Sequence, residues 1–192
     1  YSDKKFYFAE HNGAAIADMN IEHSFPKSWW GKEKNDAWCD LYNLYPSDAK
    51  ANSDKSNYPM GVVVKVTKPA GEGYDKVGTG YADGQLIKMW EPGNRFKGEF
   101  ARSYLYMATT YQHLTWVNVG LQSLENNSWP TLREWAYKLY LKWSKQDRVD
   151  QQEIDRNNAA AKIQNNRNLF IDYPNLAEYV WGDSVDVAFN PD

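Results

Sequence analysis

The stretch IEHSFPKSWW, residues 21–30, decides the fold of this chain. Pro26 has no amide proton and holds the residue before it in an extended conformation. We therefore expect residues 21–25 to form the end of a strand.

The same stretch places Glu22 directly before His23, one of three histidines in 192 residues. Neighbouring residues of a regular strand point to opposite faces, so the two side chains can act together only where the strand ends or curls. Taken alone, the pair also fits a plainer interpretation, an exposed glutamate and a histidine packed against Trp29 or Trp30.

A second extended run follows after a polar turn. Residues 31–36 read GKEKND, and residues 38–46 read WCDLYNLYP, which is rich in aromatic and aliphatic side chains. Ser47 is a plausible helix N-cap, with Asp48 favourable at the positive end of the helix dipole. The predicted order is strand, loop, strand and then a helix to about residue 57.

Polar side chains that can bind metals or phosphates crowd residues 40–57. Asparagine is a mediocre residue inside a helix, because its amide competes with the backbone, so Asn52 invites a functional explanation. Its amide oxygen is a suitable ligand for a hard cation. The alternative is a solvent-facing polar helix. The group comprises Asp40, Asn43, Ser47, Asp48, Asn52, Ser53, Asp54, Ser56 and Asn57.

Composition indicates one globular domain over residues 1–192, with 42% hydrophobic, 16% aromatic and 24% charged residues despite a mean hydropathy of -0.77. The apolar run at 61–64 is far too short to cross a bilayer. Cys39 is the only cysteine, which excludes an intrachain disulfide. No basic-then-apolar leader precedes Tyr1, so we expect that any export signal was removed or never present.

Helical periodicity dominates the second half of the chain. Residues 61–68 favour a strand, and the turn-rich residues 69–84 favour an exposed loop. We expect helices at 98–112, 131–147, 150–166 and 175–182, the last closed by Gly182. The fold class is α+β, a small sheet surrounded by several helices. Core stripes are expected at Phe100, Tyr104, Met107 and Tyr111, and at Leu132, Trp135, Leu139 and Trp143.

Common catalytic signatures are missing from the sequence. It contains no HExxH, GxxxxGK[ST], GxGxxG or GxSxG. The histidines His11, His23 and His113 have no spacing typical of a zinc site. What remains is an oxygen-rich metal site.

Four stretches together resemble the bacterial endonuclease I family: EHSFPKSWWG, DLYNLYPSDAKANSDKSNYPMG, MWEPGNRFKGEFARSYLYMATTY and KIQNNRNLFIDYPNLAEYVWG. The likeness covers roughly residues 20–182. It implies a ββα-metal (His-Me finger) core, and the predicted strand, loop, strand, helix order fits that core. It also implies a secreted or periplasmic location.

By that resemblance, His23 matches the general base, and Glu22 and Asn52 match the residues that bind a divalent cation, Mg²⁺ or else Mn²⁺ or Ca²⁺. The expected reaction is hydrolysis of DNA, with RNA as a further substrate, to 5′-phosphate and 3′-hydroxyl ends. Tyr42 and Leu169 depart from the family pattern, which commonly has a histidine and a proline there.

The net charge of -3 requires a local basic patch for any nucleic acid. Each such cation is also compatible with an ordinary solvated charge, and Arg102 with an ion pair to Glu99 or Glu91. We expect a monomer. The candidate substrate-binding residues are Lys27, Lys50, Lys55, Arg102 and Arg167, with Lys32 and Lys34 as further candidates.

Two other functions stay open. One is a nucleic-acid-binding module of the same fold that has lost catalysis, which the change at Tyr42 makes conceivable. The other is an unrelated metal-dependent hydrolase of small phosphodiesters. Plasmid nicking separates all three, because only the nuclease cuts plasmid DNA.

Overall fold

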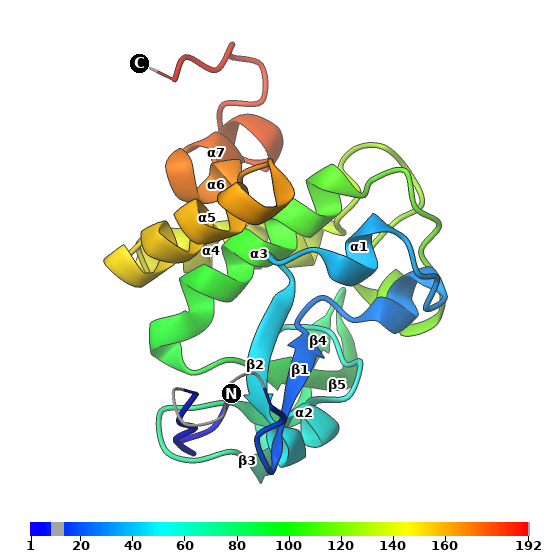
Figure 1. Ribbon diagram of the computed structural model, residues 1–192. Coiled ribbons are helices and arrows are strands. Elements are labelled where there is room, and N and C mark those ends of the chain that lie inside the picture. The colour runs from blue at the N-terminus through cyan, green and yellow to red at the C-terminus, as the bar shows by residue number, and fades with distance from the viewer. Residues whose placement is uncertain (9–13, 192) are drawn as a thin grey trace.

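Near the N-terminus, an antiparallel strand pair is followed directly by a short helix (Figure 1). In this computed structural model, which describes residues 1–8 and 14–191, β1 (Met19–His23) pairs antiparallel with β2 (Leu44–Asp48). The helix α2 (Ala49–Lys55) begins at the end of β2. The predicted ββα order is confirmed, and His23 is the last residue of its strand.

Asn43 extends the strand pair beyond His23. The Phe25 amide donates to Asn43 Oδ1 at 2.7 Å, and Asn43 Nδ2 donates to the Phe25 carbonyl at 2.9 Å. The amide of Ser24 donates to the Asn43 carbonyl at 3.0 Å. Buried side-chain bonds of this kind replace ladder bonds, so the chain leaving β1 is held in place where the histidine lies.

Two local predictions in this region were wrong. Asp48, not Ser47, is the N-cap of α2, since its Oδ1 accepts from the Ala51 amide at 2.8 Å, while Ser47 lies buried inside β2. Residues 38–46 are not one extended run, because α1 (Asp36–Cys39) occupies their start. The buried Asp40 carboxylate then forms a turn by accepting from the Tyr42 amide at 2.8 Å.

A second sheet of three antiparallel strands has the order β3–β4–β5. Its strands are β3 (Lys65–Pro69), β4 (Lys76–Ala82) and β5 (Gln85–Glu91). The strand predicted at 61–68 is confirmed in its second half, whereas the loop predicted at 69–84 is wrong, because β4 lies inside it.

The glycines that favoured a loop prediction serve the close packing of β4. A Cβ atom on Gly78 would lie 2.0 Å from the carbonyl oxygen of Lys65, and one on Gly80 would lie 2.0 Å from that of Val62. Glycine inside a strand marks such an approach of a neighbouring backbone. The turn itself is confined to Asp83 and Gly84, whose φ angles of 49° and 77° suit a two-residue hairpin.

Most of the helices gather on one side of the two sheets, whereas α2 lies beside the strands (Figure 1), and the predicted α+β class with a small-sheet core and surrounding helices is confirmed. Four of them correspond to the predicted helices, with ends shifted by one to three residues. Three short 3₁₀ helices lie at Lys27–Trp30, Asn94–Phe96 and Asn118–Gln122. The remaining helices are α3 (Lys97–Thr110), α4 (Glu134–Gln146), α5 (Gln151–Gln164), α6 (Leu169–Asp172) and α7 (Leu176–Trp181).

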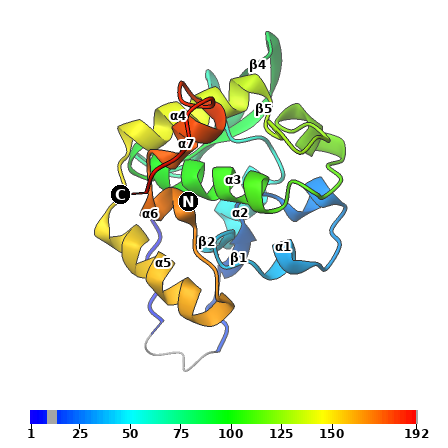
Figure 2. The ribbon, with the colours of Figure 1, turned by 90° about the horizontal axis from the view of Figure 1, so that it is seen from above.

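The helix α3 is the centre of the core. It lies between α4 and the β1–β2 pair (Figure 2), and its predicted stripe of Phe100, Tyr104, Met107 and Tyr111 is buried throughout. The Tyr104 hydroxyl donates to the Ser24 carbonyl. Since burial of large aromatic side chains dominates core energetics, α3 supplies a rigid support for the end of β1.

The stripe predicted for the second helix is confirmed in part. In the stripe of the second helix, Leu132 and Trp143 are buried, and Trp135 and Leu139 are half-buried. Asp150 caps α5 by accepting from the Glu153 amide at 2.9 Å. Within residues 1–8 and 14–191, none of the helices has the length and apolar character needed to span a membrane.

We predict that Gly78→Ala lowers the free energy of unfolding by about 1–3 kcal/mol, because the added methyl group forces β3 and β4 apart. Denaturant unfolding measures this loss. The control is Thr79→Ala on the same strand, which should cost less than about 1 kcal/mol. Equal effects of the two changes would contradict the close-approach explanation.

Candidate active site

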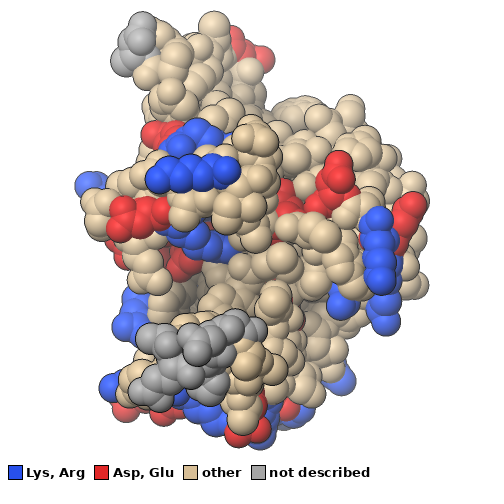
Figure 3. Space-filling view, in the orientation of Figure 1, with Lys and Arg blue, Asp and Glu red and all other residues tan. Residues whose placement is uncertain are grey.

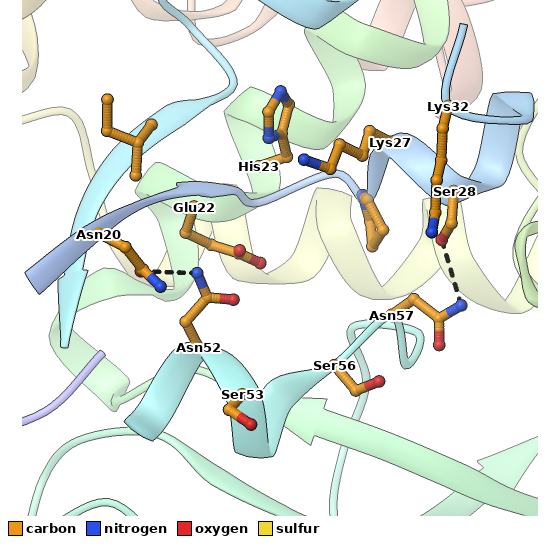
Figure 4. A pocket seen from close by; sticks show the side chains of 12 residues that line it. Asn20, Glu22, His23, Lys27, Ser28, Lys32, Asn52, Ser53, Ser56 and Asn57 are labelled. Carbon is orange, nitrogen blue, oxygen red and sulfur yellow. Dashed lines mark hydrogen bonds between the residues drawn. The ribbon is translucent and has the colours of Figure 1, made fainter. Parts of the chain in front are cut away.

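An open cleft with a volume of about 530 Å³ brings the sequence-predicted residues together (Figure 4). Its walls come from β1, the 3₁₀ helix at Lys27–Trp30 and α2. Glu22, His23 and Asn52 all line it, although the last is 29 or more positions further along the chain. Its other lining residues are Asn20, Ile21, Pro26, Lys27, Ser28, Lys32, Ser53, Ser56 and Asn57.

His23 is held by a backbone carbonyl on the far side of its ring. Its Nε2 lies 2.9 Å from the carbonyl oxygen of Trp38. A carbonyl oxygen only accepts hydrogen bonds, so Nε2 carries the proton and Nδ1 keeps its lone pair. The ring is therefore in the tautomer that a base needs.

The surroundings of His23 favour the neutral imidazole. Its pKa is lowered from the ordinary value, chiefly by partial burial and further by the positive charge of Lys27, although the bond to Trp38 opposes the shift. The ring packs edge-on against Trp38 and Trp30, at centroid distances of 5.4 and 6.4 Å. The histidine is therefore packed against tryptophan, as the plainer interpretation has it. It also lines the cleft, so the two interpretations do not exclude each other.

Glu22 is buried and paired with a lysine. Its Oε1 accepts from Lys55 Nζ at 2.6 Å, with Lys55 1% exposed and Glu22 7% exposed. The Lys55 ammonium also lies 5.0 Å from the centre of the Trp90 ring. The described part of the chain gives no hydrogen bond to the second carboxylate oxygen, Oε2.

Asn52 lies on α2, facing β1. Its Nδ2 donates to Asn20 Oδ1 at 2.8 Å, and no described residue donates to its side-chain oxygen Oδ1. In Figure 4 that oxygen and the Glu22 carboxylate point toward the same side of the cleft. The imidazole of His23 leaves β1 on the side opposite the Glu22 carboxylate (Figure 4).

A divalent cation fits these oxygens. One carboxylate oxygen and one amide oxygen are hard ligands of the kind Mg²⁺ takes, and Mg²⁺ is usually held by few protein groups while it keeps several waters. Residues 1–8 and 14–191 contain no group of three or more histidine, cysteine, aspartate and glutamate side chains that could hold a metal. His11, one of the three histidines, lies outside the described residues.

Lys27 and Lys32 are the candidate phosphate-binding cations that line the cleft. Lys27 Nζ lies 4.3 Å from the centre of the Trp38 ring, on which Lys34 also approaches at 5.8 Å. The sequence had placed all three lysines among the candidates.

The other predicted substrate contacts are occupied elsewhere. Arg102 is 1% exposed, and its guanidinium binds Glu153 and the carbonyls of Ser144 and Asp147, so its position does not support a substrate contact. Its partner is also neither of the glutamates considered from the sequence.

The remaining three cations also lie outside the cleft wall. Lys55 is buried against Glu22. The predicted role in substrate binding is therefore corrected, because this lysine holds the Glu22 carboxylate. Lys50 pairs with Asp54 on the surface of α2. Arg167 pairs with Asp172 at 2.7 Å.

The two departures from the family pattern also lie away from the cleft. Tyr42 is 1% exposed, packs on Tyr106 and donates from its hydroxyl to the Asn166 carbonyl at 2.9 Å. Its side chain is therefore part of the packing of this region. Leu169 is a half-exposed residue at the start of α6.

Sequence reasoning missed Asn20 and the role of Trp38. Asparagine is depleted in strands, so its presence in β1 was a usable signal. No local pattern could have indicated that the Trp38 carbonyl would fix the imidazole 15 residues away.

We predict that Lys55→Met lowers the free energy of unfolding by about 3–5 kcal/mol, because it leaves the buried Glu22 carboxylate without its counter-charge. Denaturant unfolding measures the loss. The double variant Glu22→Gln/Lys55→Met removes both charges and should recover a large part of it. A double variant no more stable than Lys55→Met would argue against the charge-pair explanation.

Comparison with known proteins finds nucleases among the similar chains. The chain is 34% identical over 177 residues to an extracellular ribonuclease of Bacillus subtilis (strain 168), covering 88% of this chain and 56% of the relative. It is 28% identical over 148 residues to an extracellular deoxyribonuclease of Aeromonas hydrophila, covering 73% and 52%. A periplasmic deoxyribonuclease of Aeromonas hydrophila is 29% identical over 133 residues, covering 69% and 47%.

The chain spans about half the length of these curated relatives. The sequence model of the endonuclease I family matches residues 2–175, which include both strands of the ββα unit, the cleft and the helices α3–α6. The chain belongs to the endonuclease I family.

Proposed function

We propose that this chain is a divalent-cation-dependent endonuclease that hydrolyses nucleic acid without sequence preference and leaves 5′-phosphate and 3′-hydroxyl ends. The observation that carries the proposal is the hydrogen bond between His23 Nε2 and the Trp38 carbonyl, which leaves Nδ1 without a hydrogen bond to any described residue, in the same cleft as Glu22 and Asn52. The relatives named as ribonuclease and deoxyribonuclease support a nucleic-acid substrate.

His23 acts as the general base. Nδ1 takes a proton from a water molecule as the water oxygen attacks phosphorus, the bond from phosphorus to the 3′ oxygen breaks on the opposite side, and the departing 3′ oxygen takes a proton from solvent water to become the hydroxyl. A base of this kind must be neutral at the working pH, and the burial that lowers the pKa of His23 favours the neutral form. The Trp38 carbonyl keeps the ring oriented, so the lone pair is directed before substrate arrives.

Glu22 and Asn52 would hold the cation through one carboxylate oxygen and the amide oxygen. When bound, Mg²⁺ or a similar ion supplies positive charge to the phosphate and to the departing oxygen. Glu22 is fixed by its ion pair, and Asn52 by its hydrogen bond to Asn20. Each of the two proposed ligands is therefore held by a contact with a neighbouring element.

Substrate binding rests on phosphate contacts, since cleavage without sequence preference needs no reading of base edges. On the face drawn in Figure 3, acidic and basic side chains are interspersed. Lys27 and Lys32, which line the cleft, are the candidates for local phosphate contacts. The extracellular and periplasmic relatives support a location outside the cytoplasm.

We predict that the protein converts supercoiled plasmid to nicked and linear forms in the presence of Mg²⁺ and that EDTA abolishes the cleavage, because the ion neutralises charge in the reaction. Parallel digestion of RNA determines which polymer is preferred. Retention of plasmid without cleavage would indicate a binding module instead. Cleavage of a chromogenic diester but not of plasmid would indicate a small-molecule hydrolase.

We predict that His23→Ala reduces the rate of plasmid cleavage by about a hundredfold or more, because the general base is lost. The matched control is His113→Ala, which removes an exposed imidazole lining a different pocket and should leave the rate unchanged. The measurement is the initial rate at saturating Mg²⁺. Equal rates for the His23 variant and the unmodified protein would end the assignment of the base.

A further inference from the structure

Two side-chain links join β1 to α2, and each ends on one of the candidate metal ligands. Asn52 Nδ2 donates to Asn20 Oδ1 at 2.8 Å, and Lys55 Nζ donates to Glu22 Oε1 at 2.6 Å. In each link, the ligand atom that forms the hydrogen bond differs from the atom that we expect to bind the ion. The amide nitrogen of Asn52 and one oxygen of Glu22 are occupied, which leaves one oxygen of each side chain for the cleft.

The spacing of these four residues follows from the two kinds of secondary structure. Asn20 and Glu22 are two apart on a strand, so their side chains leave the same face of β1. Asn52 and Lys55 are three apart on a helix, so they are neighbours on one face of α2. Strand and helix thus meet along two parallel contacts.

The Asn20 link decides which end of the Asn52 amide faces the cleft. A carboxamide has a donor end and an acceptor end of nearly equal size, and rotation about its last bond exchanges them. In this structure Asn20 turns its Oδ1, an atom that only accepts, toward α2, and the Asn52 nitrogen is the end that meets it. The oxygen of Asn52 then points to the same side as the Glu22 carboxylate (Figure 4).

We propose that Asn20 is a positioning residue, which holds the Asn52 amide with its oxygen toward the divalent cation. The proposal rests on the function proposed above and extends its metal site by one residue. Asn20 does not bind the ion itself, because its own oxygen is engaged by Asn52. Partners of metal ligands that act in this way typically change metal affinity by about 10–100-fold.

The test is a titration of this chain with Mn²⁺ in the absence of nucleic acid. Electron paramagnetic resonance measures the concentration of the free ion. Asn20→Ala should raise the dissociation constant about tenfold, and Asn52→Ala should raise it at least as much. The double variant Asn20→Ala/Asn52→Ala should bind no more weakly than Asn52→Ala, since Asn20 acts only through Asn52. Plasmid cleavage by Asn20→Ala should recover as Mn²⁺ is raised.

The matched control is Asn158→Ala, which removes an exposed asparagine on α5 that contacts Arg167, and it should bind Mn²⁺ as the unmodified protein does. Thermal melting establishes that each variant is folded, and Asn20→Leu, which keeps the size of the side chain without its acceptor, should repeat the result of Asn20→Ala.

Unchanged Mn²⁺ binding by both Asn20 variants, with weaker binding by Asn52→Ala, would overturn the positioning role and leave the proposed metal site intact. Additive losses in the double variant would also overturn it. Unchanged binding by Asn52→Ala would remove the metal site itself, and the proposal with it.

Discussion

The buried ion pair between Lys55 and Glu22 is the contact on which the arrangement of the cleft depends. Both charges are almost fully removed from water, and a pair of this kind is costly to break by removing one partner, even where its net contribution to stability is small. It ties the last turn of α2 to the middle of β1. The carboxylate is therefore fixed in place without a contribution from ligand or substrate.

The remaining contacts around the cleft work in the same direction. Asn43 continues the pairing of β1 and β2 past His23, and Tyr104 of the central helix α3 binds the Ser24 carbonyl. The segment between the two strands returns far enough to bring the Trp38 carbonyl onto the imidazole. A site in which the proposed base and the proposed metal ligands are held by packed elements needs little further ordering when substrate binds.

Residue type alone does not distinguish the candidate cations that are buried from those that line the cleft. Arg102 and Lys55 are buried and neutralise Glu153 and Glu22, so they hold the fold together. Lys27 and Lys32 line the cleft, where their positive charges attract a polyanion. With a net charge of -3 for the whole chain, attraction of nucleic acid depends on such local placement.

Features governed by neighbouring residues were predictable. Pro26 ends the extended segment after β1, and the regular spacing of apolar residues located the helices α3 and α4. The resemblance in the stretches around Glu22, His23 and Asn52 indicated three residues that do line one cleft.

Features governed by distant partners were decided only by the tertiary structure. Gly78 and Gly80 looked like loop residues, yet they lie in a strand because another backbone passes where a Cβ would stand. Arg102 and Lys55 were candidate substrate-binding residues, but each is paired with a glutamate, 51 and 33 positions away respectively. The amino-acid sequence by itself determined which residue types were available and the local conformations they favour, whereas the packing of remote segments decided which charges were buried and which nitrogen of His23 was left free.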